Sequence, residues 1–318
     1  MKNENPFRYS DDNKRYHTLN YYNKTEFGSK VFKAVIDAGF SCPNKDGTKS
    51  VGGCIYCMSG SGYFTEKTDG RIYDSVKQQL TAEKERIYKK HPGSLITAYF
   101  QANTNTYAPV DILREAYTSA LDFGVHGISI GTRADCLPDD VTALLSDINS
   151  RTHLTVELGL QTIHDKTAQI INRCYNYDEF LSGYRKLKNA GIRTCLHLID
   201  GLPGETKADM LATAAEVARL HPDAVKIHLL HVNRSTALEQ LYLSGDYSPL
   251  TRDEYIDIVI AQLEYLPADI VIERITGDAD KRCLVAPLWS ADKIAVLGGI
   301  DKQMALRNTY QGILTTGQ

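Results

Sequence analysis

Three cysteines with the character of metal ligands lie within one short run, CPNKDGTKSVGGCIYC, at Cys42, Cys54 and Cys57. Thiolates are soft ligands that favour iron–sulfur clusters, zinc and copper(I). A structural zinc site is normally closed by four ligands, and no further Cys or His lies near this run. The pattern therefore favours an iron–sulfur cluster with one open iron, where chemistry can occur. The alternatives are a zinc knuckle or buried thiols with no ligand role.

Composition places the chain among ordinary globular proteins and excludes several classes. Its 318 residues suffice for one large α/β domain or two small ones. No apolar run approaches the roughly 18 residues of a membrane helix, and the N-terminus lacks the apolar core of a secretory signal. We therefore expect a cytoplasmic protein with no membrane partner. The seven cysteines argue for reduced thiols, and the net charge of −3 excludes a globally basic nucleic-acid binder while allowing a local basic patch.

The elements that must position the cysteines alternate regularly after residue 30. Short β-branched runs predict strands at 31–36, 95–100, 127–131, 154–160, 193–199 and 224–230. Apolar residues at helical spacing predict helices at 72–88, 110–122, 138–149, 178–190 and 207–220. Asp111 and Asp178 occupy positions typical of N-caps, and Gly191 a position typical of a C-cap.

Six strands joined by five crossover helices predict a parallel sheet, which right-handed crossovers would curl into an open or partial barrel. We expect an N-terminal extension at 1–30, the barrel at 31–250, and a C-terminal extension or substrate cap at 251–318. In such barrels the reacting residues lie at the C-terminal ends of the strands. The residues that follow the six predicted strands are the cysteine run, Gln101 with Asn103, Arg133, Gln161, the glycines of 201–204, and His231.

Eight stretches of the chain resemble the radical S-adenosylmethionine (radical SAM) superfamily, and more closely its YhcC/YtqA-like subfamily, which is related to Elp3-type enzymes. They are FGSKVFKAVIDAGFSCPNKDGT, GGCIYC, YFQANTNTYAP, IGTRADCLP, VELGLQTIHDKTAQIINR, GLPGET, VKIHLL and RITGD. One departure is the gap of eleven residues between Cys42 and Cys54, where most members have three. Long first gaps also occur in Elp3-like branches.

The resemblance implies an α/β fold, a partial (β/α)6 TIM-like barrel of the radical SAM type with N- and C-terminal extensions. It also implies that Cys42, Cys54 and Cys57 bind a [4Fe–4S] cluster whose fourth iron is chelated by the amino and carboxylate groups of S-adenosylmethionine (SAM). One electron would then cleave SAM to methionine and a 5′-deoxyadenosyl radical, which abstracts a hydrogen atom from the substrate. The protein would supply positioning and exclude water.

The resemblance further implies SAM contacts in the loops around the cluster. Tyr56 stands where the family places an aromatic residue near adenine, with loop packing as the alternative. Gln101 stands where the family binds the methionine amino group, because its carbonyl can accept a hydrogen bond from an ammonium. His197 aligns with another SAM-site position, and a satisfied core histidine is the equal alternative.

Three further residues complete the predicted SAM site. Glu157 lies on the fourth strand, where a carboxylate could accept hydrogen bonds from both ribose hydroxyls. The alternative is a carboxylate paired with a lysine, since a charge within an apolar strand needs a partner. Gln161 could bind the ribose, and Arg173 could pair with the SAM carboxylate.

The resemblance extends to the substrate class. Elp3-like enzymes modify the wobble uridine of tRNA at its C5 side chain, so it implies a tRNA uridine substituent as substrate, with a flavodoxin- or ferredoxin-like electron donor. Two alternatives remain open: a radical SAM enzyme acting on a small molecule or peptide, and a non-enzymatic, metal-stabilised binding module. Residues 274–283 are the best candidate for a substrate cap. Basic clusters at 84–90, 185–188 and 274–282 could contact phosphates or could be solvated helix faces.

Overall fold

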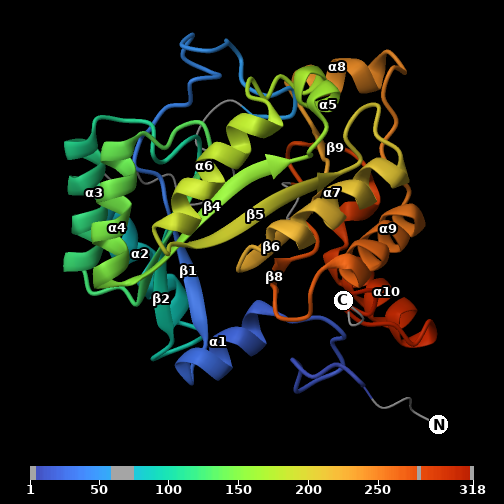
Figure 1. Cartoon of the computed structure of the whole chain (residues 1–318), viewed down its shortest axis with the longest axis horizontal. Coiled ribbons are helices and arrows are strands. Elements are labelled where there is room, and N and C mark those ends of the chain that lie inside the picture. The colour runs from blue at the N-terminus through green and yellow to red at the C-terminus, as the bar shows by residue number, and fades with distance from the viewer. Residues whose placement is uncertain (1–4, 59–74, 278–280, 316–318) are drawn as a thin grey trace.

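The computed structural model describes residues 5–58, 75–277 and 281–315. Its centre is a curled sheet of seven parallel strands in the order β1-β2-β3-β4-β5-β6-β8, a partial barrel (Figure 1). The strands are β1 (Val31–Ile36), β2 (Leu95–Phe100), β3 (Gly127–Thr132), β4 (His153–Gln161), β5 (Arg193–Asp200), β6 (Ala224–Leu229) and β8 (Val271–Arg274). The α/β partial barrel expected from the sequence is confirmed.

Helices join the strands in the predicted alternation. The crossovers are α2 (Val76–Tyr88), α3 (Val110–Asp122), α4 (Asp139–Arg151), α6 (Tyr177–Asn189), α7 (Lys207–Leu220) and α9 (Arg252–Tyr265). The remaining elements are α1 (Leu19–Phe27), α5 (Asp165–Ile170), α8 (Ala237–Leu243), η1 (Leu288–Ala291), α10 (Lys293–Leu306) and the antiparallel pair β7 (Val232–Asn233) and β9 (Leu284–Ala286). Figure 1 shows α5 and α8 at one end of the sheet and α1 at the opposite end.

The sheet contains one strand more than the sequence predicted. The strand β8 pairs with β6 and comes from the segment assigned to the C-terminal extension. Thr18, from the segment assigned to the N-terminal extension, forms a bridge with Ile272 of β8. The domain limits at residues 30 and 250 stay predictions. No helix within the described ranges is both long enough and apolar enough to span a membrane.

The helix ends correct two of the three predicted caps. The helix α3 begins after Pro109, and α6 begins after Asn176, whose side chain forms a capping box with Glu179. Asp111 and Asp178 therefore lie in the first turns, where a negative charge interacts favourably with the helix dipole, and the N-cap predictions were wrong. Gly191 has a φ of 65°, and its N–H bonds to the carbonyl of Lys188, as a glycine after a helix C-terminus does.

The hydrophobic core lies between the sheet and its helices. Leu113 and Tyr117 of α3 and Phe180 of α6 are fully buried against strand residues such as Ile128 and Val156. Each such side chain contributes about 1.5–3 kcal/mol when removed from water. This core fixes the strand ends, and the strand ends carry the site.

A buried acid–amide pair joins β5 to α9. Asp200 and Gln262 are each 1% exposed, and Gln262 Nε2 donates to Asp200 Oδ1 at 2.7 Å. Asp200 Oδ2 and Gln262 Oε1 have no hydrogen-bond partner among the described residues. Burial raises the pKa of Asp200 to about 7. A protonated Asp200 would satisfy both oxygens by donating its proton to Gln262 Oε1.

Asp200→Asn is expected to stabilise the protein at alkaline pH and to leave it unchanged near pH 4. A raised folded pKa gives stability that is lost as pH rises from the unfolded value of about 4 through about 7. An asparagine can accept from Gln262 Nε2 through its Oδ1 and donate to Gln262 Oε1 through its Nδ2, and it does not ionise. The gain at pH 9 is therefore about 2–4 kcal/mol, since each tenfold change in proton affinity corresponds to about 1.4 kcal/mol. Urea unfolding at pH 5 and pH 9 measures it. A pH-independent difference between the two proteins would contradict the buried neutral acid.

Candidate active site

The cysteine loop follows β1 and is shaped by two tight turns. The N–H groups of Lys45 and Asp46 donate to the carbonyl of Cys42 at 2.8 and 3.1 Å, and the N–H of Cys57 donates to the carbonyl of Cys54 at 2.9 Å. Gly53 has a φ of 82°, which glycine adopts without strain. All three thiols are free and half-buried.

Segments from far along the chain hold this loop in place. Asn172 Nδ2 donates to the carbonyl of Gly53 at 2.8 Å, and Asn44 Nδ2 donates to the carbonyl of Asn172 at 2.5 Å. The N–H of Ile55 bonds to the carbonyl of Ile171 at 3.1 Å, and the Ile55 carbonyl accepts from the N–H of Leu238 at 2.9 Å. The positions of the cysteines are thus set by α5 and α8 as well as by their own loop.

The surroundings of Cys57 favour its thiolate form. A hydrogen bond from Cys54, with Lys45 and Arg133 nearby, lowers the pKa of Cys57 to about 6, although burial opposes the shift. The same shared bond raises the pKa of Cys54. Soft thiolates next to cations are a donor set that fits an iron–sulfur cluster. Across 5–58, 75–277 and 281–315, no three His, Cys, Asp or Glu side chains converge as a single metal ion would require. A [4Fe–4S] cluster places each cysteine on a different iron.

A cavity of about 240 Å³ opens at the carboxyl ends of β4, β5 and β6 and brings three of the predicted SAM residues together. Tyr56, Gln161 and His197 line it, with His228 and Leu230 among the other lining residues. A ligand in this cavity would lie directly beside the Cys54–Cys57 turn, because Tyr56 belongs to that turn.

Two polar atoms on this cavity lack partners among the described residues. They are Gln161 Oε1 and His228 Nε2, both buried. Gln161 has a φ of 66° at a register shift of β4, and a Cβ at Gly159 would lie 2.6 Å from Gln161 Nε2. The glycine thus makes room for this side chain. Buried polar atoms without partners are costly, so they favour a polar ligand such as SAM here.

Glu157 lies deeper, inside the barrel, and its carboxylate is fully occupied. It accepts hydrogen bonds from Lys33 at 2.6 Å, Ser129 at 2.6 Å, Tyr99 at 2.8 Å and His197 at 2.8 Å, and it also pairs with Lys226. Burial would raise the pKa of Glu157, but Lys226 and Lys33 lower it well below its ordinary value. The structure thus places Glu157 in the lysine-paired environment. A ribose contact stays a prediction, and it would require these bonds to rearrange.

The sequence offered two interpretations of His197, a SAM contact and a core histidine with its hydrogen bond satisfied. In the structure its ring is hydrogen-bonded to Glu157 and it also lines the cavity. Burial and the nearby Lys226 lower its pKa, despite the bond to Glu157, so the ring is neutral. The nitrogen facing an ionised carboxylate must carry the proton, so Nε2 donates to Glu157. The Nδ1 atom is then a hydrogen-bond acceptor.

Arg173 and Gln101 do not line this cavity. Arg173 is 1% exposed, and its Nη1 donates to the carbonyls of Leu160 and Thr162 at 2.5 and 2.6 Å. Its Nη2 has no hydrogen bond among the described residues and lies 3.8 Å from Asp165. Gln101 is half-buried after β2, and its N–H donates to the carbonyl of Ile36 at 3.1 Å. Their SAM contacts stay predictions.

Sequence reasoning missed several supporting residues. Asn44 and Asn172 hold the cysteine loop, and Asn172 has a φ of 54°. Lys33 and Lys226 balance Glu157. The sequence does contain a signal for these lysines, because each of the two apolar strands VFKAVI and AVKIHL has one lysine in its middle. A charged side chain at such a position needs a buried partner of opposite charge.

The stretch proposed as a cap packs beside the cavity. The strand β7 pairs with β9, and the N–H of Arg234 donates to the carbonyl of Cys283 at 2.8 Å. A Cβ at Gly277 would lie 3.3 Å from His231 Cε1 and 3.8 Å from His228 Nδ1. Residues 278–280 of this stretch lie outside the described residues. The described part of 274–283 therefore borders the histidine side of the cavity.

Comparisons with known proteins place this geometry in a family. The family model of the radical SAM superfamily matches residues 47–217, and the Radical_SAM C-terminal domain matches residues 222–305. The uncharacterized protein YtqA of Bacillus subtilis is 46% identical over 314 residues, which are 98% of this chain and 96% of that protein. The tRNA uridine(34) acetyltransferase of Methanocaldococcus jannaschii is 29% identical over 133 residues, 41% of this chain and 25% of that protein.

The fold is also found in a solved structure. Elp3 of the archaeon Methanocaldococcus infernus matches with a TM-score of 0.66 and 17% identity, over 89% of this chain and 64% of that one. The chain therefore belongs to the radical SAM superfamily, in the YhcC/YtqA-like group related to Elp3, and is a radical SAM enzyme that binds a [4Fe–4S] cluster and SAM.

Proposed function

We propose that this radical SAM enzyme acts in tRNA modification, on the C5 side chain of a wobble uridine. The observation that carries the proposal is the sequence similarity to a tRNA uridine(34) acetyltransferase, supported by the shared fold with an Elp3. The chain spans only 25% of that acetyltransferase. The proposal therefore concerns the kind of substrate and not the whole reaction of that protein.

In the proposed site Cys42, Cys54 and Cys57 would hold the [4Fe–4S] cluster. When bound, the cluster and SAM would supply a 5′-deoxyadenosyl radical, with the electron coming from a flavodoxin- or ferredoxin-like donor in the cytoplasm. The protein positions SAM and keeps water from the reacting atoms.

The proposed contacts to SAM use residues that line the cavity. Tyr56 offers an aromatic face to adenine, Gln161 Oε1 accepts from a ribose hydroxyl, and His197 Nδ1 accepts a second hydrogen bond. Gln101 is proposed for the methionine ammonium and Arg173 for the carboxylate. Glu157 acts in this arrangement by fixing the ring of His197.

The basic clusters differ in their distance from the site. Lys89 and Lys90 follow α2 and precede the amino end of β2, far from the cysteine loop, and Lys186 and Lys188 pair with acidic groups. Arg274 ends β8 at the same end of the sheet as the cysteine loop and contributes to the low pKa of His228, which burial mainly causes. Among the three clusters, 274–282 is the one proposed to contact tRNA phosphates.

The test compares tRNA nucleosides by mass spectrometry from wild-type cells, a deletion strain, and the deletion strain carrying Cys54→Ala. We expect a uridine-derived nucleoside to change in the deletion strain, with rescue by wild type and none by Cys54→Ala. Identical nucleosides in all strains would refute the tRNA substrate. Formation of 5′-deoxyadenosine by the purified enzyme is measured in parallel, so that SAM cleavage is tested separately from the identity of the substrate. If the tRNA nucleosides are unchanged but the purified enzyme still cleaves SAM, a small molecule or a peptide is the better candidate for the substrate.

A further inference from the structure

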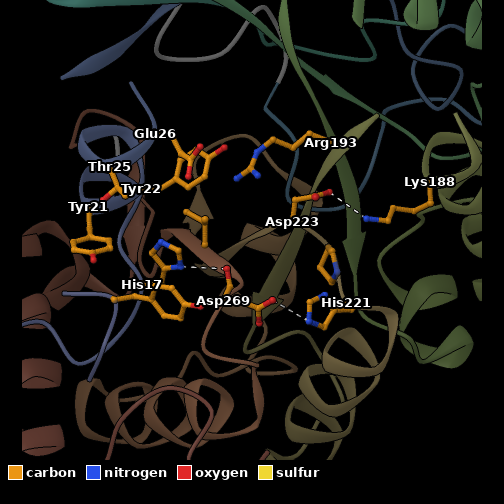
Figure 2. Close-up of a pocket in the computed structure, with 13 residues that line it drawn as sticks. His17, Tyr21, Tyr22, Thr25, Glu26, Lys188, Arg193, His221, Asp223 and Asp269 are labelled. Atoms are coloured by element: carbon orange, nitrogen blue, oxygen red, sulfur yellow. Dashed lines mark hydrogen bonds and ion pairs between the residues drawn. The ribbon is translucent and has the colours of Figure 1, made fainter. Parts of the chain in front are cut away.

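A second cavity, of about 360 Å³, lies at the opposite end of the barrel from the cysteine loop. It is bounded by the amino ends of β5 and β8, by the turn before β6, and by α1, as Figure 2 shows. We call it the basal cavity. All strands of the sheet are parallel, so their amino ends lie together at one end of the barrel and the cysteine loop, which follows β1, lies at the other.

Most of the charged groups in the basal cavity are already paired with one another. Asp223 accepts hydrogen bonds from the N–H and Oγ1 of Thr194 at 2.8 and 3.1 Å and from Lys188 at 3.3 Å. Asp269 lies 3.3 Å from Nε2 of His221 (Figure 2). These pairs leave neither carboxylate in need of a ligand.

Arg193 differs from these groups. In the described part of the chain its guanidinium forms no hydrogen bond and no ion pair, and its Nη2 is buried without a partner. The guanidinium carbon lies 4.4 Å from the centre of the Tyr22 ring. Figure 2 shows the Arg193 side chain extending toward Tyr22 and Glu26 from the far side of the hollow. A buried donor without an acceptor is costly, and more so when it is charged.

The atom without a partner, Nη2 of Arg193, is a hydrogen-bond donor in a positively charged guanidinium group. A ligand at this position must therefore supply a hydrogen-bond acceptor. Arginine binds carboxylate and phosphate oxygens through its planar fork. Glu26 also lines the cavity, and Arg193 extends toward it in Figure 2, yet the two form no ion pair in the described structure. An oxyanion from outside the chain would satisfy the fork.

The aromatic side chains of the basal cavity suit a planar ring attached to that oxyanion. Tyr9, Tyr21 and Tyr22 line the cavity together with His17, whose ring is stacked on Tyr9. Aromatic faces and edges pack favourably against planar rings. A volume of about 360 Å³ is near the lower limit for small-molecule sites, so it accommodates a mononucleotide.

We propose that the basal cavity binds a nucleoside monophosphate, with the phosphate on Arg193 and the base against the tyrosine-lined wall. This site is separate from the SAM site and independent of the tRNA proposal. It gives the barrel a small-molecule site on the side that does not carry the radical chemistry.

The test measures binding of guanosine 5′-monophosphate (GMP), guanosine and inorganic phosphate to the cluster-loaded full chain by calorimetry, with SAM at saturation. We expect GMP to bind at least about tenfold more tightly than either guanosine or phosphate, because both parts of the molecule make contacts. Arg193→Gln should weaken GMP binding at least about tenfold, and Arg193→Lys by less, since lysine keeps the charge without the fork. Arg151→Gln is the matched control, because Arg151 ends α4 at the same end of the barrel but does not line the cavity.

Arg193→Gln should retain wild-type SAM cleavage, which shows that the barrel is folded. The proposal is overturned if GMP does not bind the wild type, or if it binds Arg193→Gln as tightly. Phosphate binding as tight as GMP binding would overturn the assignment of a base to the tyrosine-lined wall.

Discussion

Replacing Cys54 by alanine is expected to remove the iron–sulfur cluster and to abolish reductive cleavage of SAM. Cys54 shares a hydrogen bond with Cys57 and closes the tight turn between them, so its loss leaves two thiolates where the cluster needs three. We expect iron and sulfide in the anaerobically reconstituted protein to fall from about four of each per chain to a small residue. Formation of 5′-deoxyadenosine with dithionite should fall below detection.

The control for this experiment is Cys136→Ala. The Cys136 thiol is buried near Asp135 and close enough to Cys42 for the two to interact electrostatically. We expect this variant to keep its iron and its activity, and circular dichroism should show that both variants are folded. Wild-type iron content and activity in Cys54→Ala would refute the assignment of Cys54 as a ligand.

Glu157→Gln is expected to destabilise the folded protein by about 3–5 kcal/mol, because it leaves Lys33 and Lys226 buried with less compensating charge. The pKa of Glu157 lies well below its ordinary value of 4.5 in the folded state. Its contribution is therefore present above the unfolded pKa and is lost as pH falls through the folded value. The difference between variant and wild type should be largest near neutral pH and shrink below about pH 4.

Urea unfolding of the cluster-free chain at pH 7 and at about pH 3 measures this effect, with Glu83→Gln as the control. Glu83 pairs with the exposed Arg86, so its loss should cost less than about 1 kcal/mol. SAM affinity is measured in parallel. If Glu157→Gln keeps wild-type stability and loses only SAM affinity, the network has no stabilising role and the ribose contact is the better description.

The order of strands and helices could be predicted because each element is indicated by residues that are close together in the sequence. Each of the six predicted strands is present, with ends within about one residue, because β-branched runs between helical patterns leave little freedom. The strand β8 was missed as an element of the sheet, since VIER is short and half charged. The cap at Asn176 was missed because Asn176 and Asp178 are both polar and compete for the N-cap position. The start of α3 was missed because Pro109 makes no side-chain cap bond, so backbone geometry alone marks that helix end.

The site could be predicted in part for a similar reason. The Cys54–Cys57 spacing is a local property, and Gln161 and His197 follow or end strands that the sequence located. The environment of Glu157 could not be predicted, because its partners come from five other strands and only the register of the sheet brings them together. Likewise, the support of the cysteine loop by Asn172 joins residues 119 positions apart.

The hydrogen bonds that hold the cysteine loop also determine when the cluster can be inserted. Ile55 bonds to Ile171 and Leu238, so the turn between Cys54 and Cys57 is complete only after α5 and α8 have taken their places. In the unfolded chain the three thiols have no fixed arrangement, whereas in the folded barrel hydrogen bonds hold the cysteine loop in one conformation. We therefore expect the cluster to assemble after the barrel has folded, because the loop that carries Cys54 and Cys57 is held by segments from later in the chain.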